Sequence, residues 1–178
     1  MCALLARRLS SSTGPAQLVR NAYKQLETRL NVRSAPGAWF EVSQERISRF
    51  GDTIEDRQWI HCDPERATRE SPFGTTIAHG NLILCLAPYL PRADDADGEI
   101  PGLPPLEGVK RGVNYGWNKI RFMSPVPSGA QIRASHTLKE LEIVPPASLH
   151  LVSELLVEVQ GSEKPCMVAE TVGRAIFE

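Results

Sequence analysis

The chain has few cysteines, no long apolar run and no excess of charge of one sign. Its four cysteines are widely spaced over 178 residues and form no C-x-x-C pair, so neither a zinc knuckle nor a disulfide framework is indicated. This use of cysteine fits a reducing, intracellular compartment. There is no apolar stretch long enough to span a membrane. The formal net charge of -1 gives no basic field to hold nucleic acid.

The composition that remains is that of a globular chain, with 42% hydrophobic and 23% charged residues. The length predicts a single domain over residues 15–178. Residues 1–14 are expected to be a flexible or targeting segment, because the chain carries several arginines and serines and no acid before Glu27. A transit peptide would place the protein in the mitochondrial matrix. A merely extended N-terminus would leave it in the cytoplasm.

Four stretches predict helices. Apolar residues recur at helical spacing over 16–30. Ser43 and Asp63 each have the features of an N-cap before a short helix, and Asp63 is followed by proline at the first helical position. Residues 77–90 are apolar nearly all round, which is typical of a helix buried inside a fold.

The second half of the chain predicts strands. Residues 113–123, 131–144, 148–159 and 166–177 are rich in Val, Ile and Leu with partial alternation, and turn-forming residues separate them. Together with a short strand near 39–42, they predict an antiparallel meander. Residues 91–105 are rich in Pro, Gly and Asp and predict a surface loop. One buried helix against one curled antiparallel sheet, an α+β fold, covers both apolar surfaces.

Candidate chemistry gathers just ahead of the buried helix. Asp56 and His61 are five residues apart in a segment interrupted by turn formers, so their side chains can converge on one water molecule. A carboxylate beside an imidazole suits proton transfer near neutral pH. In a loop, such a pair is also commonly a helix cap and a surface histidine.

The segment from Ser71 to Gly80 strengthens the catalytic interpretation, because it leads a Gly- and Pro-containing loop into the start of that helix. Unpaired backbone N–H groups there suit a developing oxyanion, and Gly80 permits close approach of a ligand. His79 is either support for this site or a core histidine at a tight turn.

These residues carry a resemblance to a known family. The runs Asp56-Arg-Gln-Trp-Ile-His61-Cys-Asp-Pro-Glu-Arg-Ala67 and Ser71-Pro-Phe-Gly-Thr-Thr-Ile-Ala-His-Gly80 resemble the signature of MaoC-like R-specific enoyl-CoA hydratases and 3-hydroxyacyl-thioester dehydratases. Downstream runs at 113–122, 125–129 and 164–170 follow the order seen in the branch that includes nodulation-protein-N-like members. The resemblance covers about residues 39 to 178.

The resemblance implies a hot-dog fold, in which a curled antiparallel sheet wraps a long central helix and two chains pair as a homodimer. It places the catalytic residues at Asp56 and His61 and the oxyanion-binding amide at Gly80. The implied reaction adds water to a trans-2-enoyl thioester of CoA or acyl carrier protein, or removes it from an R-3-hydroxyacyl thioester, in fatty-acid metabolism. No metal or other cofactor is implied.

The chain departs from the family pattern at three positions. Glu55 stands where many relatives have glycine before the aspartate, and it could compete with Asp56 for its role. Arg57 and Asn81 replace residues common in this branch and could tune substrate fit. Asn114, Tyr115 and Arg121 are further substrate-binding candidates, although a solvated sheet face explains these polar residues equally well.

Two other functions share the expected fold. Hot-dog proteins include acyl thioesterases and non-catalytic acyl-binding subunits, and fold alone does not separate these classes. The histidine five residues after Asp56 favours a hydratase over a thioesterase, because it adds a second proton carrier at the same water. The retention of Asp56, His61 and Gly80 together argues against a non-catalytic subunit.

Overall fold

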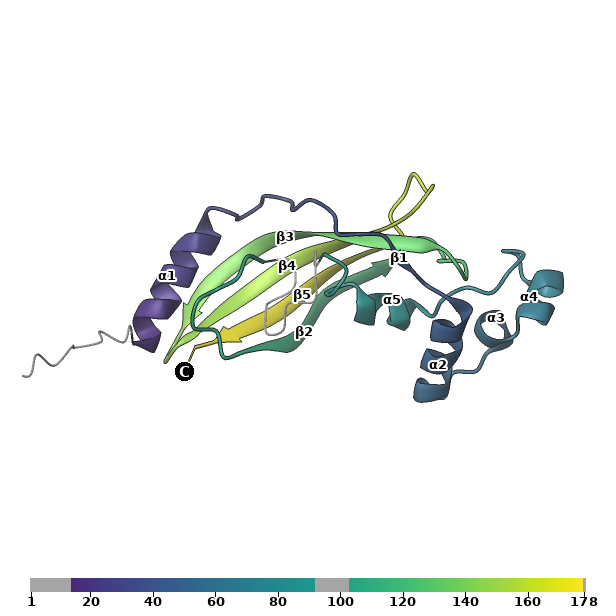
Figure 1. The fold of residues 1–178 in the computed structure, drawn as a ribbon, viewed down its shortest axis with the longest axis horizontal. Helices are drawn as coiled ribbons and strands as arrows, with labels where there is room; N and C mark the ends of the chain where they lie inside the picture. The colour runs from purple at the N-terminus through teal and green to yellow at the C-terminus, as the bar shows by residue number, and fades with distance from the viewer. Residues whose placement is uncertain (1–13, 92–102, 178) are drawn as a thin grey trace, which may run out of the picture.

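The computed structural model describes residues 14–91 and 103–177, which form five helices and five strands (Figure 1). Most of the N-terminal segment and of the predicted 91–105 loop lies outside these residues. No described helix is long and apolar enough to cross a membrane. In chain order the elements are α1 (Pro15–Glu27), β1 (Phe40–Glu41), α2 (Gln44–Ile54), α3 (Trp59–Cys62), α4 (Pro64–Glu70), α5 (Gly80–Leu86), β2 (Arg111–Phe122), β3 (Gln131–Val144), β4 (Ser148–Val159) and β5 (Met167–Ile176).

The strands form one curled antiparallel sheet in the order β1-β3-β4-β5-β2, with α5 on its concave side (Figure 1). This is the predicted hot-dog arrangement. The simple meander is wrong in one respect, because β2 pairs with β5 at the far edge and not with β3. The 125–129 connection is held elsewhere: the Ala78 amide donates to the Val126 carbonyl at 2.8 Å, and the Gly129 amide donates to Val42 at 2.9 Å. The chain therefore crosses the end of the sheet between β2 and β3.

The central helix is shorter than the sequence predicts. The apolar run at 77–90 forms a helix only from Gly80 to Leu86. Before it, the Ile77 amide donates to the Ile60 carbonyl at 3.1 Å, which holds the chain extended. After it, Pro88 has no N–H to continue the helical ladder. Only Leu82 and Ile83 of α5 are fully buried.

The capping predictions are confirmed. The Ser43 hydroxyl accepts from the Arg46 amide at the start of α2, and the Asp63 carboxylate accepts from the Arg66 amide at the start of α4. The amphipathic helix α1 is also confirmed, and its buried residues are Val19, Ala22 and Leu26. The two caps fix where α2 and α4 begin, and the buried stripe fixes which side of α1 packs against the rest of the fold.

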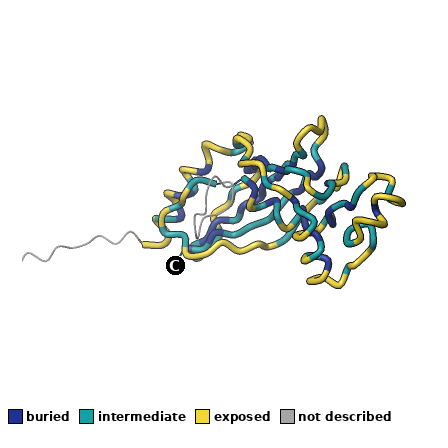
Figure 2. The backbone as a smooth tube through the Cα atoms, turned by 45° about the vertical axis from the view of Figure 1, so that its right-hand side comes forward, coloured by how far each residue is buried: buried dark blue, intermediate teal, exposed yellow. Residues whose placement is uncertain are grey.

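The inner face of the sheet carries two separate apolar clusters, one toward each end of the strands. The buried stretches of the backbone lie along these strands (Figure 2). One joins the sheet to α5 and α2, and it includes Ile47, Leu82, Ile83, Leu155, Val157 and Met167. The other joins the sheet to α1, and it includes Val19, Leu26, Leu138, Leu149, Leu151 and Phe177. Between them the side chain of His136 is buried, with 5% of its surface exposed.

Burial lowers the pKa of His136 from 6.5 to about 4, because a charged imidazole loses its hydration inside the fold. Between these two values the unfolded chain binds the proton and the folded chain does not. Lowering the pH through this window therefore favours unfolding.

We expect the free energy of unfolding to fall by about 1–2 kcal/mol more in the wild type than in His136→Leu when the pH is lowered from about 7 to about 5. The leucine variant has no group at this position that gains a proton on unfolding. Urea denaturation of both proteins at the two pH values measures the difference. An equal loss of stability in both proteins would contradict the assignment.

Candidate active site

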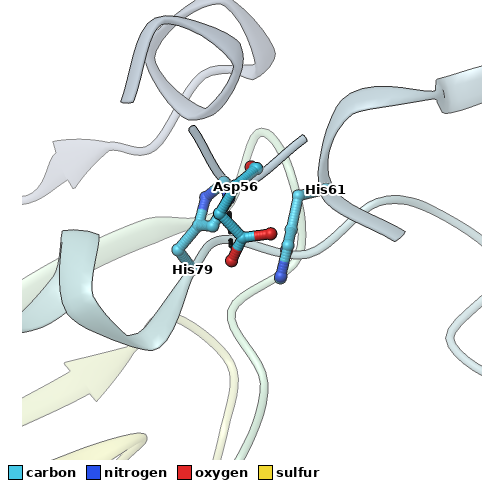
Figure 3. A group of neighbouring side chains, drawn as sticks. All are labelled: Asp56, His61 and His79. Carbon is cyan, nitrogen blue, oxygen red and sulfur yellow. Dashed lines mark hydrogen bonds and ion pairs between the residues drawn. The ribbon is translucent and has the colours of Figure 1, made fainter. Parts of the chain in front are cut away.

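Three side chains from separate elements meet beyond the end of the sheet. Asp56 follows α2, His61 lies in α3, and His79 directly precedes α5. One nitrogen or oxygen atom from each lies within 4.8 Å of the others (Figure 3). The structure thus brings together Asp56 and His61, the two residues expected to share a water molecule.

Asp56 is positioned by the sharp end of α2. Glu55 follows the helix with φ 60° and ψ 19°, a left-handed conformation that turns the chain. The Asp56 carboxylate then accepts from the Gln58 amide at 3.4 Å. Its side chain is 36% exposed, so the carboxylate is held by the fold and still reaches solvent.

His61 is held in one orientation. Its Nδ1 lies 2.7 Å from the Ile77 carbonyl, and since a carbonyl only accepts, Nδ1 carries the proton in the neutral ring. Nε2 is left free to accept a proton. The backbone is fixed too, because Gln44 Nε2 donates to the His61 carbonyl at 2.8 Å and Thr76 donates to the other end of the Gln44 amide.

His79 is buried behind the pair, with 3% of its surface exposed. Its Nε2 donates to the Asp56 backbone carbonyl at 2.9 Å, and its ring stacks on His61 with 3.9 Å between centroids. Phe50 packs against it at 5.4 Å. His79 is therefore a support that touches both Asp56 and His61, the first of the two roles considered from the sequence.

Gly51 is a part of the site that sequence reasoning missed. A Cβ at this position would lie 2.8 Å from the Asp56 carbonyl oxygen, 2.9 Å from Cys62 Sγ and 3.2 Å from the His79 ring. Only glycine lets α2 approach the three residues this closely. The one available signal was a glycine inside a helical stretch.

Gly80 begins α5, so its backbone N–H has no partner within the helix. It lines a cavity of about 340 Å³ together with Phe122 and Cys166. A Cβ on Gly80 would lie 3.0 Å from the Phe122 ring. The absence of a side chain thus lets β2 close over the start of α5.

The three weaker candidates lie outside this cluster. Asn114 accepts from the Gly116 amide at 3.0 Å, Tyr115 accepts from Arg174 at 3.2 Å, and Arg121 donates to the Ile120 carbonyl at 2.8 Å. Asn114 lies about 25 Å along β2 from Phe122, the residue of this strand whose ring packs against Gly80. All three therefore serve contacts within the sheet, and Asn114 also lines a second and larger cavity.

Cys62 is not arranged as a nucleophile. Burial raises the pKa of its thiol, and the nearby carboxylates of Asp52 and Asp56 raise it further. A thiol kept protonated in this way is a poor nucleophile.

Two imidazoles and a carboxylate are also donors that a divalent cation can bind. Two of the four ring nitrogens are already engaged, one with the Ile77 carbonyl and one with the Asp56 carbonyl. The two nitrogens that remain are Nε2 of His61 and Nδ1 of His79, which is buried without a partner. A cation held by Nε2 of His61 and the Asp56 carboxylate would occupy the same atoms that would hold a water molecule. Proton transfer needs no rearrangement of these bonds.

Comparison with known proteins identifies the family of the chain. Residues 29–148 match the family model described as the MaoC like domain. The chain belongs to the MaoC-like family. It is 41% identical over 138 residues to 3-hydroxyacyl-thioester dehydratase Z of Mycobacterium tuberculosis, covering 78% of this chain and 85% of that protein. It is 34% identical over 145 residues to nodulation protein N of Rhizobium leguminosarum bv. viciae, covering 82% and 85%.

Solved structures share the fold of this MaoC-like chain. The (R)-hydratase from A. caviae superposes with a TM-score of 0.58 at 19% identity, covering 81% of this chain and 94% of that one. The monoamine oxidase regulatory protein from Archaeoglobus fulgius gives a TM-score of 0.63 at 23% identity, covering 84% and 91%. These likenesses confirm the hot-dog fold.

The departures noted from this MaoC-like pattern have structural consequences. Arg57 pairs with Asp52 at 2.8 Å on the surface. Asn81 is exposed in the first turn of α5. Glu55 holds the left-handed conformation that glycine adopts without strain, which explains why glycine suits the position before the aspartate.

We expect Glu55→Gly to stabilise the fold by about 1 kcal/mol, because glycine removes the strain of a Cβ at positive φ. Chemical denaturation measures the change. Glu55→Ala is the matched control, since it removes the same carboxylate and keeps the Cβ. An equal gain in the alanine variant would mean that the charge of Glu55, and not its backbone conformation, is the destabilising factor.

Proposed function

We propose that this protein is a hydro-lyase that hydrates trans-2-enoyl thioesters with R specificity, or dehydrates R-3-hydroxyacyl thioesters, in fatty-acid metabolism. The observation that supports it most is the convergence of the Asp56 carboxylate and the free Nε2 of His61 beside His79, the residue that precedes Gly80. The dehydratase named among its relatives covers most of both chains, and the (R)-hydratase shares its fold.

The geometry supplies the parts that the reaction needs. Asp56 and His61 hold one water molecule, whose oxygen adds to C3 of the enoyl group while C2 gains a proton. The two groups share their titration, so the formal base is a property of the pair. In the reverse direction the pair removes a proton from C2 and returns one to the departing hydroxyl.

The Gly80 amide is the proposed donor to the thioester carbonyl, which gains negative charge as the enolate forms. His79 is a positioning residue, because it touches Asp56 through the backbone carbonyl and His61 through its ring face. The substrate is carried as a thioester of CoA or of acyl carrier protein, and neither metal nor other cofactor takes part.

A thioesterase is the second candidate on this fold. It would direct the water at the thioester carbonyl and release the thiol. The position of His61 favours hydration, because a free Nε2 beside the carboxylate gives the same water two proton carriers.

We expect Asp56→Asn and His61→Ala each to lower kcat for a trans-2-enoyl-CoA by about two orders of magnitude or more, because each removes a positioned acid–base group. Loss of the conjugated thioester absorbance measures hydration, and a thiol reagent in a parallel reaction detects thioester cleavage. Absorbance loss without thiol identifies a hydratase, and thiol release identifies a thioesterase.

The matched controls are Asp52→Asn and His150→Ala, which change a surface carboxylate outside the cluster and a histidine of β4. Both should keep near-normal activity, and a chelator should have no effect. Near-normal activity in Asp56→Asn or His61→Ala would remove the assignment of the pair.

We also propose that the protein is a homodimer paired along β2. This strand is 12 residues long and lies at an edge of the sheet, so the backbone groups on its outer side have no strand partner among the described residues. Val113, Tyr115 and Phe122 are exposed large apolar residues of β2. A long, exposed edge of this kind is a template for pairing with another chain, and exposed apolar residues along it are typical of an interaction site.

We expect the wild type to sediment as a dimer at micromolar concentration and the double variant Val113→Glu, Tyr115→Glu as a monomer. Charges on the edge strand disfavour pairing through repulsion and desolvation. Ile143→Glu is the control, since Ile143 is also exposed but lies on β3. A monomeric wild type, or a dimer that survives the double variant, would contradict pairing along β2.

A further inference from the structure

The inner face of the sheet loses its apolar character at one level, and it does so on three adjacent strands. On β4, Ser153 lies between Leu151 and Leu155, which belong to different core clusters. On β3 the intervening residue is His136, and on β5 it is Thr171. Side chains two apart on a strand share a face, so these three polar residues point the same way as the apolar residues on either side.

The strand register places the three residues side by side. Ser153 pairs directly with Thr171, and His136 pairs with Leu155, the next inward-facing residue on β4. We call His136, Ser153 and Thr171 the polar row. All three line a cavity of about 780 Å³, whose other walls include Leu84, Trp117 and Leu155. This volume lies within the usual range for small-molecule sites.

Two residues of the polar row are buried and Thr171 is half-buried, and the row lacks hydrogen-bond partners among the described residues. Both His136 and Ser153 are 5% exposed. None of the three side chains makes a hydrogen bond with another residue in the part of the chain that the structure describes. Their polar atoms are not among the fully enclosed atoms without a partner, so a ligand or water in the cavity can supply the hydrogen bonds that the protein does not.

The hydrogen-bonding capacity of the row is that of neutral groups. Burial lowers the pKa of His136 to about 4, so its ring is uncharged at neutral pH and offers one donor and one acceptor. The two hydroxyls can each do both. The basic residues of the cavity lie farther along: Arg174 is three residues, or about 10 Å, beyond Thr171, and Arg111 pairs with Ile176, five residues and about 16 Å beyond it.

The cavity lies near the candidate active site along α5, although Asp56, His61, His79 and Gly80 do not line it. Leu84 and Cys85 line it, and they lie about one helical turn beyond Gly80 on α5. Along the sheet, Phe122, which closes over Gly80, pairs with Met167, while the polar row is reached at Thr171. Four residues of strand separate these levels, or about 13 Å. If the thioester lies at Gly80, an acyl chain of medium length is therefore long enough to reach the polar row.

We propose that the acyl group of the substrate carries a neutral oxygen function, a ketone or a hydroxyl, near the far end of a medium-length chain or ring, and that His136, Ser153 and Thr171 bind it. This inference rests on the proposed function, since it takes the acyl thioester as the ligand. A plain alkyl chain would leave the row without partners. A carboxylate would be placed among neutral groups, where its charge is poorly stabilised.

The test compares two medium-chain trans-2-enoyl-CoA substrates of equal length, one plain and one with a ketone on the penultimate carbon. The wild type should show a kcat/KM about tenfold higher for the ketone, the usual size of one or two added hydrogen bonds in a buried site. Calorimetric binding of the corresponding saturated acyl-CoA pair should show the same preference, and this readout does not depend on turnover.

In the double variant Ser153→Ala, Thr171→Val, the ratio of kcat/KM for the ketone substrate to kcat/KM for the plain substrate should fall close to one. The control is Ser135→Ala, Thr137→Val, because these residues are buried to a similar degree on β3 and face away from the cavity. Their replacement should leave the preference unchanged. This pairing separates loss of the row from general loss of packing.

Each result has a distinct meaning. Equal use of both chains, a preference for a terminal carboxylate, or an unchanged preference in the Ser153, Thr171 double variant would overturn the inference. Absence of hydration together with tighter binding of the ketone would support the polar row and reject the hydratase assignment. Hydration of the plain chain with no ketone preference would support the hydratase assignment and reject the role of the polar row.

Discussion

The hydrogen bond between the His61 ring and the Ile77 carbonyl is the contact on which the site depends. It joins α3 to the segment that leads into α5, and the backbone bond between Ile77 and Ile60 runs beside it. The same bond fixes which nitrogen of His61 carries the proton. The placement of His61, the orientation of its free nitrogen and the entry into the central helix are therefore set together.

Support from behind is as important as the pair itself. His79 holds the Asp56 carbonyl and stacks on His61, while Gly51 leaves room for both. Side chains locked by packing and hydrogen bonds lose little freedom when substrate binds, which favours a well-defined reacting geometry. Asp56 and His61 thus reach solvent, while His79 and Gly51, which position them, are buried.

Local signals predicted most of the elements. The caps at Ser43 and Asp63, the amphipathic stripe of α1 and the strand runs all appear within a few residues of their predicted positions. The motif between Asp56 and Gly80 also led to the residues that meet in space. These features depend on short-range chemistry, namely caps, periodicity and turn residues, which a sequence displays directly.

Features decided by long-range contacts were not predictable in this way. The apolar run at 77–90 was too uniform to show that Ile77 and Ala78 bond to distant carbonyls and leave only Gly80–Leu86 as helix. The position of β2 beside β5 depends on how the 125–129 segment is anchored elsewhere. Gly51 and the polar row likewise became visible only when separate strands and helices were brought into register.

The contact between Phe122 and Gly80 joins two parts of the molecule that are otherwise distinct. Phe122 is the last residue of the edge strand, and Gly80 is the first residue of the central helix. The Phe122 ring thus lies between the end of this edge strand and Gly80 at the start of the helix. The edge of the sheet and the shape of the pocket at Gly80 therefore cannot vary independently.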